Sequence, residues 1–173
     1  MRHPAFVVLV VLLSLWAPLA LAGQEVTESL PASTRVATLT GGVGNTMGWF
    51  GLQGERYFAG ERLSLFLGAG YTPEIDPGIP TGPTFALGIR GFTAGLKHRG
   101  FLALSLSQLF VEQYGNSRRF YGPGLEAGYQ FASRGGFTIM AALGLGYAPG
   151  VPEHASKVGG MAELGLGYTW LRQ

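Results

Sequence analysis

From Arg35 onward, large apolar residues alternate with small or polar ones, and clusters of turn-forming residues interrupt the alternation. A period of two places successive side chains on opposite faces of a β-strand. The pattern predicts eight strands, over residues 35–44, 48–58, 62–72, 84–93, 100–111, 120–132, 137–148 and 158–171. A tilted strand needs about 9 to 11 residues to cross a bilayer, and each predicted strand has about that length. The sequence therefore predicts an all-β protein whose strands are long enough to span a membrane.

The connections between the predicted strands are tight at one end and longer at the other. The tight ones contain AGE (59–61), AGLKHR (94–99) and SRGG (133–136). The longer ones are PEIDPGIPTGP (73–83), EQYGNSRR (112–119) and PGVPEHASK (149–157), and only the connection around residues 44–48 is short at that end. Outer-membrane barrels have this plan, with short periplasmic turns and longer extracellular loops. We therefore expect both chain termini on the periplasmic side, and the loops around Asp76, Arg118 and His154 outside the cell.

The two faces of the predicted strands differ sharply in chemistry. One face carries bulky apolar residues without a charge: Leu63, Leu65, Leu67, Ala69, Phe85, Leu87, Ile89, Leu102, Leu104, Leu106, Leu125, Ala127, Tyr129, Ile139, Ala141, Leu143, Leu145, Leu164 and Leu166. The other face carries small, polar or charged residues: Gln53, Glu55, Ser64, Gly68, Gly88, Arg90, Ser105, Ser107, Glu126, Gln130 and Glu163. A soluble sandwich or lipocalin-like barrel with a leucine core would expose more lysine and glutamate and would have little reason to use glycine on its outer face. We therefore expect the apolar face to look into lipid and the small or polar face to line a narrow eight-stranded barrel.

Arg90 is the one basic residue that the alternation places in the middle of the inward face. Glu55, Glu126 and Glu163 are inward-facing acids at similar distances from the periplasmic strand ends. An unpaired charge in a narrow interior is costly, whereas a paired and hydrogen-bonded one is tolerated. We expect an interior charge network in which Arg90 contacts at least one of these acids, with Glu126 and Glu55 favoured. Three acids around one base also require water or a protonated carboxyl group.

Aromatic residues gather near both predicted rims. Tyr71 and Tyr147 fall at one rim, and Tyr129, Tyr168 and Trp170 at the other. Aromatic girdles at the two membrane interfaces are typical of outer-membrane barrels.

With these features the chain resembles the small eight-stranded outer-membrane β-barrels of Gram-negative bacteria, the OmpA/OmpX-like class. The resemblance covers nearly all of the mature chain as a pattern. In that class the last strand resembles polar-x-Gly-x-x-aromatic-x-aromatic, the signal that the barrel assembly machinery recognises. Glu163, Gly165, Tyr168 and Trp170 occupy those places, although the class usually ends on the aromatic and this chain continues through residues 171–173. The resemblance implies an antiparallel up-and-down transmembrane barrel in the bacterial outer membrane. It also implies lipid and lipopolysaccharide as neighbours and the assembly machinery as a partner during biogenesis.

The N-terminus predicts a cleaved secretory signal peptide. Arg2 and His3 precede an apolar run over residues 6–16, and Ala20-Leu21-Ala22 is an A-x-A cleavage site. The run is shorter than the roughly 20 residues of a membrane-spanning helix. We expect a signal peptide over residues 1–22, a short polar tail over 23–34 and the barrel over 35–173.

Composition narrows the chemistry further. Charged residues make up only 13% of the chain, which fits a membrane-embedded protein better than a soluble one. The formal net charge of +2, without a dense basic patch bearing interleaved aromatics, gives no reason to expect nucleic-acid binding. The absence of cysteine excludes disulfides, Cys-based zinc sites and thiol nucleophiles. His98 and His154 fall at opposite rims, so we expect neither a shared metal site nor a cofactor.

His154 and Ser156 are the one candidate catalytic pair. Some small outer-membrane barrels are lipid A deacylases, whose active-site segment resembles His-x-Ser-Asn with a distant Glu. Lys157 stands here in place of the Asn, Glu163 is the candidate carboxylate, and the pair falls in a proline-rich loop. The sequence thus favours a non-enzymatic barrel with a structural or surface-interaction role. A narrow channel or carrier for a small apolar solute and a lipid A-modifying hydrolase remain the alternatives.

Overall fold

The computed structural model describes residues 34–73, 81–113, 116–151 and 156–172. The predicted signal peptide lies outside these residues, as does almost all of the predicted polar tail. Within the described residues, no helix is long and apolar enough to cross a bilayer.

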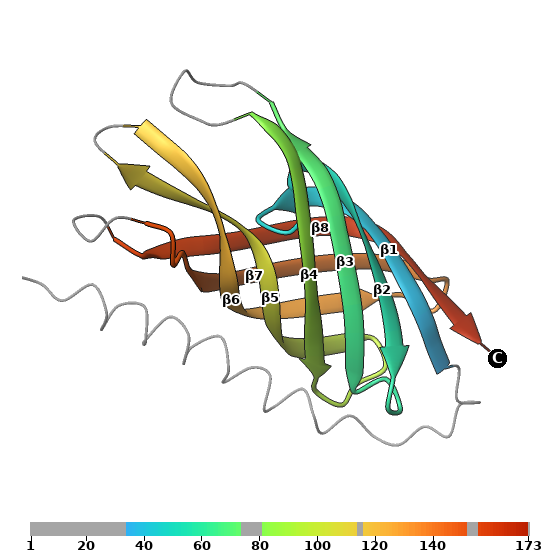
Figure 1. Cartoon of the computed structure of the whole chain (residues 1–173). Coiled ribbons are helices and arrows are strands. Elements are labelled where there is room, and N and C mark those ends of the chain that lie inside the picture. The colour runs from blue at the N-terminus through green and yellow to red at the C-terminus, as the bar shows by residue number, and fades with distance from the viewer. Residues whose placement is uncertain (1–33, 74–80, 114–115, 152–155, 173) are drawn as a thin grey trace, which may run out of the picture. The chain divides into compact units, whose positions relative to one another are not determined.

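The described residues form a closed barrel of eight antiparallel strands (Figure 1). The strands are β1 (Thr34–Gly44), β2 (Gly48–Phe58), β3 (Leu63–Thr72), β4 (Gly82–Phe92), β5 (His98–Gln113), β6 (Asn116–Ala132), β7 (Phe137–Tyr147) and β8 (Val158–Arg172). Each strand pairs with the next along the chain, and β1 pairs with β8 to close the barrel, from Thr34↔Arg172 to Gly44↔Glu163. The prediction of an eight-stranded antiparallel up-and-down barrel is confirmed. Below, the terminal rim is the end where β1 begins and β8 ends, and the far rim is the opposite end.

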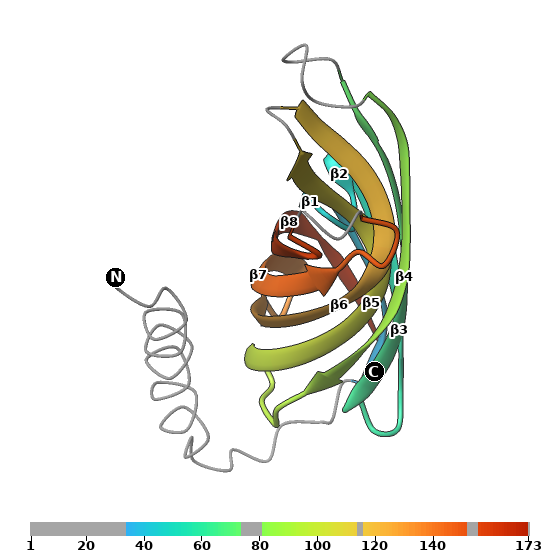
Figure 2. The same ribbon diagram turned by 60° about the vertical axis from the view of Figure 1, so that its left-hand side comes forward.

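The connection between β5 and β6 differs from the prediction. The sequence predicts a long loop over residues 112–119, but the ladder continues to Gln113↔Asn116. The charges in this segment hide its strand character from an alternation criterion. Pairing between β4 and β5, in contrast, ends at Leu87↔Leu106. The β5–β6 hairpin beyond this point therefore leaves the wall formed by β3 and β4, as Figures 1 and 2 both show.

The two faces of the wall have the polarity of a membrane barrel. Outward-pointing apolar side chains such as Leu67 and Phe85 are 62% and 61% exposed. Inward-pointing residues, including the charged Arg90, are almost fully buried. Arg56 is an exception to the charge-free outer face, because it points outward two residues before the end of β2. A long side chain at that position can extend its guanidinium toward the polar interface.

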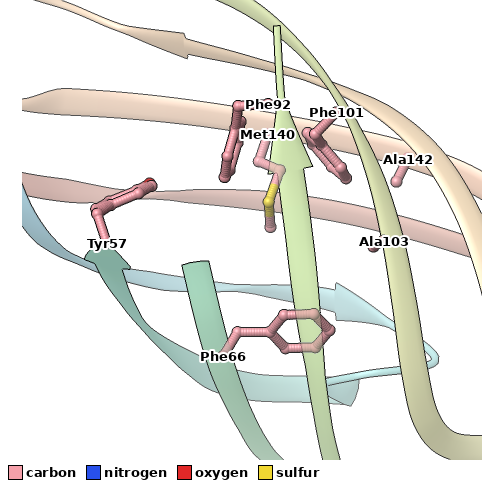
Figure 3. Close-up of a cluster of buried hydrophobic side chains, with 7 residues drawn as sticks. All are labelled: Tyr57, Phe66, Phe92, Phe101, Ala103, Met140 and Ala142. Atoms are coloured by element: carbon pink, nitrogen blue, oxygen red, sulfur yellow. The ribbon is translucent and has the colours of Figure 1, made fainter. Parts of the chain in front are cut away.

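Large side chains, and not only glycine and alanine, fill the interior. A buried cluster occupies the lumen in the half that includes the terminal rim, contributed by Tyr57, Phe66, Phe92, Phe101, Ala103, Met140 and Ala142 (Figure 3). A second cluster lies toward the far rim and contains Leu109, Ala148, Val151 and Met161, with Phe120 packed against it. The barrel interior is therefore a packed core with polar groups embedded in it.

Candidate functional site

Arg90, on β4, is fully buried in the lumen and is the centre of the interior charges. Its Nη2 lies 3.1 Å from Glu163 Oε1 and 3.2 Å from Glu163 Oε2, and its Nη1 lies 3.5 Å from Glu55 Oε1. Nη1 also donates a hydrogen bond of 2.8 Å to Gln53 Oε1. The guanidinium carbon lies 4.3 Å from the ring centroid of Phe66. Arg90 thus bridges β4 to β2 and β8 across the lumen, because inward-facing positions on these strands converge there.

The partners of Arg90 are themselves hydrogen-bonded. Tyr57 and Ser64 donate to the Glu55 carboxylate, and the Gln53 side-chain amide donates to Glu163 Oε1 at 3.0 Å. Glu126 accepts a hydrogen bond of 3.2 Å from Ser105 and makes no ion pair with Arg90 within 4.0 Å. The expected contact between Arg90 and Glu55 is confirmed, whereas the second partner of Arg90 is Glu163 and not Glu126. Glu55, Glu126 and Glu163 all face inward, as Arg90 does, so the facing of a residue alone does not determine which acids reach Arg90.

A second charged cluster closes the terminal rim. Arg99 Nη2 donates to Gln130 at 2.6 Å, and its Nη1 donates to the Glu61 backbone carbonyl at 3.1 Å. The guanidinium of Arg99 lies over the Phe92 ring, 4.1 Å from its centroid. Arg35 contacts the Glu61 carboxylate and the Leu96 carbonyl. Arg99 Nη1 also lies 3.7 Å from Glu61 Oε2, so two buried arginines share one carboxylate at this end.

The alternation pattern does not predict this cluster at the terminal rim. The segment Lys97-His98-Arg99 suggests a solvated basic turn, but β5 begins at His98 and points Arg99 into the barrel. His98 is exposed, and its Nδ1 hydrogen-bonds the Tyr129 hydroxyl. The inward parity of Arg99 with Phe101 and Ala103 on β5 is the signal that could have placed it.

The β1–β2 turn folds into the lumen at the far end. Thr46 and Met47 are completely buried. Thr46 Oγ1 accepts a hydrogen bond of 3.0 Å from Gln53, which in turn bonds Arg90. Asn45 donates from its side chain to the Gln108 carbonyl on β5. This inward turn joins the central charge network to the β5–β6 hairpin.

Gln108 makes further hydrogen bonds inside the barrel near the far rim. Its amide bonds Thr72 at 3.3 Å, and Thr84 donates to its Oε1 at 3.0 Å. Gln108 has the outward parity of β5 yet is completely buried, because β5 has left the wall at this height and lies across the mouth. Polar groups thus bond across the lumen near the far rim as well.

The candidate catalytic residues do not form a site in the described residues. His154 lies outside them. Ser156 Oγ donates to the Val158 carbonyl at 2.9 Å and accepts from the Val158 amide, as in a local turn. Glu163, the candidate orienting carboxylate, is held in the lumen by Arg90. No group of three or more metal-ligating side chains occurs in the part of the chain that the structure describes.

The predicted girdle residues lie on the outer face at the two rims. Tyr71 and Tyr147 are exposed near the far rim, and Tyr129, Tyr168 and Trp170 near the terminal rim. On β8, Glu163 and Gly165 have inward parity, whereas Tyr168 and Trp170 point outward. The four residues of the proposed assembly signal therefore divide between the lumen and the outer face.

Fold and interior together define an outer-membrane-type β-barrel with a side-chain-filled lumen. The structure is similar to the crystal structure of the N-terminal β-barrel domain of Pseudomonas aeruginosa OprF, with a TM-score of 0.53 and 17% sequence identity. The match covers 80% of this chain and 100% of that domain. No family model and no curated protein matches the sequence. The resemblance to small eight-stranded outer-membrane barrels is thus confirmed for the fold.

Proposed function

We propose that this chain is an integral protein of the bacterial outer membrane with a structural or surface-interaction role and a lumen closed to solutes. The observation that carries the proposal is the inverted polarity of the barrel. A charged network centred on Arg90 is buried inside, while leucine and aromatic side chains are exposed around the outside. Such an outer face is stable only in an apolar solvent. Lipid and lipopolysaccharide are then its neighbours, and the barrel assembly machinery is its partner during insertion.

The closed lumen is supported at three heights. Arg99 and Arg35 bond across the terminal end, Arg90 across the middle, and Thr46 and Gln108 across the far end. One apolar cluster packs in the half of the lumen that includes the terminal rim, and the other packs toward the far rim. In this proposal the barrel anchors its far-rim connections at the cell surface, and both termini face the periplasm.

Cell fractionation and bilayer recordings test this function. The protein is expected in the outer-membrane fraction, with a heat-modifiable gel mobility, and without steady conductance in planar bilayers. Steady conductance would favour the channel alternative over the closed barrel. Altered lipid A mass spectra on expression would favour the hydrolase alternative, in which case His154→Ala should restore the unmodified spectrum.

A further inference from the structure

The terminal rim carries a ring of exposed basic side chains. Arg62 is the last residue of the β2–β3 turn, Lys97 lies in the β4–β5 turn, Arg134 lies in the β6–β7 turn, and Arg172 ends β8. Each of these side chains is exposed. Arg56, exposed near the end of β2, is the fifth member. We call these five residues the basic ring. Its members lie on β2, on β8 and on the three turns of the terminal rim, so they are distributed around the barrel.

Nothing in the described residues neutralises the basic ring. Glu61 is the one carboxylate of the terminal rim in these residues, and its ion pairs go to the buried Arg35 and Arg99. Within the residues that the structure describes, no member of the basic ring forms an ion pair with a carboxylate. The sequence of the far-rim connections is different, because Glu74, Asp76, Glu112 and Glu153 accompany Arg118, Arg119 and Lys157 there. Positive charge is thus concentrated at one end of the barrel.

The backbone holds this ring in place. The Phe92 amide on β4 donates to the Arg62 carbonyl at 2.8 Å, and the Ala132 amide on β6 donates to the Lys97 carbonyl at 2.8 Å. The Thr169 amide on β8 donates to the carbonyl of Gly136, two residues after Arg134, at 2.7 Å. Each turn is therefore bonded to a strand beyond its own hairpin, and the basic side chains start from fixed positions.

The surroundings of the ring indicate the chemistry of its partner. Tyr129, Tyr168 and Trp170 are exposed on the outer face at the same rim, next to the apolar belt. Aromatic side chains of this kind lie at the height of lipid headgroups. Basic side chains at that height attract anionic lipids. A soluble macromolecule would need a contiguous patch, whereas charges spread around the circumference match a shell of lipid.

We propose that the basic ring binds the phosphate groups of anionic phospholipids in the leaflet that surrounds the terminal rim. This inference rests on the proposed membrane insertion. The ring would select phosphatidylglycerol-type lipids from a mixed leaflet and fix the height of the barrel in the bilayer.

The two exposed tryptophans provide a test, because Trp170 lies at the terminal rim and Trp49 near the far rim. The full chain with Trp16→Phe and Trp49→Phe keeps Trp170 as its reporter, and the chain with Trp16→Phe and Trp170→Phe keeps Trp49. Each is placed in vesicles that mix phosphatidylglycerol and phosphatidylcholine, with one of the two lipids brominated to quench nearby tryptophan. We expect brominated phosphatidylglycerol to bind beside Trp170 about threefold or more tightly than brominated phosphatidylcholine. At Trp49 the ratio should be near one.

Added salt and removal of the basic side chains test whether charge causes the lipid preference at Trp170. Raising the salt concentration screens surface charge, so the ratio of phosphatidylglycerol to phosphatidylcholine binding beside Trp170 should fall toward one while the basic ring is still intact. Replacing Arg62, Lys97, Arg134 and Arg172 by Gln should do the same in low salt, whereas the control pair Arg118→Gln and Lys157→Gln should leave the ratio unchanged.

Equal quenching of Trp170 by both lipids, or an equal preference at Trp49, would overturn the lipid site while leaving membrane insertion intact. Quenching by neither lipid at either tryptophan would remove membrane insertion and this inference together. A response of Trp170 to soluble peptidoglycan fragments without lipid preference would assign the ring to that polymer and overturn the proposal.

Discussion

Arg90 combines several interactions that compensate one another. Its guanidinium loses all contact with solvent, a cost that two carboxylates, one amide oxygen and two aromatic rings offset. The partners come from β2, β3, β5 and β8, so the interaction links strands that are not neighbours in the wall. Removing one member of such a buried pairing leaves the opposite charges buried without compensation.

Removal of this side chain should therefore be costly. Arg90→Ala leaves Glu55 and Glu163 buried without their cation, and we expect a loss of about 3 to 5 kcal/mol in the free energy of unfolding. The measurement is urea unfolding of the vesicle-inserted protein, followed by tryptophan fluorescence. Arg118→Ala, which removes an exposed arginine at the far rim, is the control. Equal unfolding midpoints for the two variants would show that the buried pairing contributes nothing.

Two glycines on the inner face of β3 lie against the backbone of the β1–β2 turn, which leaves no space for a side chain. A Cβ on Gly70 would collide with the Met47 carbonyl of the inward β1–β2 turn, and Gly68 meets the Thr46 carbonyl in the same way. Gly54, on the outer face of β2, has nothing within 4 Å of an added Cβ. The backbone of the turn thus occupies the space that side chains would otherwise take.

This contrast gives a matched pair of substitutions. Gly70→Ala should destabilise the barrel by about 1 to 3 kcal/mol, since either the turn or β3 must move. Gly54→Ala should leave stability almost unchanged. The stability of both variants is measured by urea unfolding, followed by the ellipticity of the β-strands at roughly 218 nm. If Gly70→Ala were as stable as Gly54→Ala, the inward position of the β1–β2 turn would be wrong.

At the scale of elements, β8 has two separate tasks. Its inward face supplies Glu163 to Arg90, and its outward face places Tyr168 and Trp170 edge to face, with ring centroids 5.5 Å apart. The outward pair belongs to the terminal-rim girdle and to the ending that resembles an assembly signal. The ion pair in the lumen and the outward residues of the proposed assembly signal therefore lie on opposite faces of one strand.

The double substitution Tyr168→Ala and Trp170→Ala should lower the amount of inserted barrel. The control is Tyr71→Ala with Tyr147→Ala, which removes two exposed aromatics from the far rim and leaves the end of β8 intact. Outer-membrane levels of heat-modifiable protein are compared by immunoblot. Equal levels for the two double variants would show that the end of β8 is not a signal of its own.

Some elements of the barrel can be predicted from the sequence and others cannot. Strand positions and the direction of each side chain follow from the alternation, because a residue's parity determines whether it lies on the outer face or in the lumen. Parity does not show how far a side chain reaches, so it could not choose between Glu126 and Glu163 as the partner of Arg90. It fails entirely where the chain leaves the wall. The inward turn at Thr46 and Met47 and the buried position of Gln108 depend on contacts between distant strands.

At the scale of the whole molecule, the barrel is asymmetric along its axis. The terminal rim combines tight turns with the basic ring, whereas the far rim carries the longer β3–β4 and β7–β8 connections and the extended β5–β6 hairpin, in which charges of both signs occur. The proposed orientation assigns the terminal rim to the periplasm.

Cysteine labelling on whole cells tests this orientation. The chain has no cysteine, so a single substitution reports one position. Ser117→Cys, near the tip of the β5–β6 hairpin, should react with a membrane-impermeant maleimide. Ser133→Cys, at the β6–β7 turn, should react only after the cells are opened. The reverse pattern would invert the barrel in the membrane.

The central claim is that the leucine face of every strand lies in lipid and the polar face in a closed lumen. β5 tests it most directly, because Leu104 and Leu106 point outward and alternate with the buried Ser105 and Ser107. Four single-cysteine variants at these positions, inserted in vesicles, are treated with a lipid-soluble maleimide. The account predicts rapid labelling at Leu104→Cys and Leu106→Cys, and protection at Ser105→Cys and Ser107→Cys until the protein is unfolded in urea. Labelling at the serine positions with protection at the leucines, or no alternation at all, would contradict it.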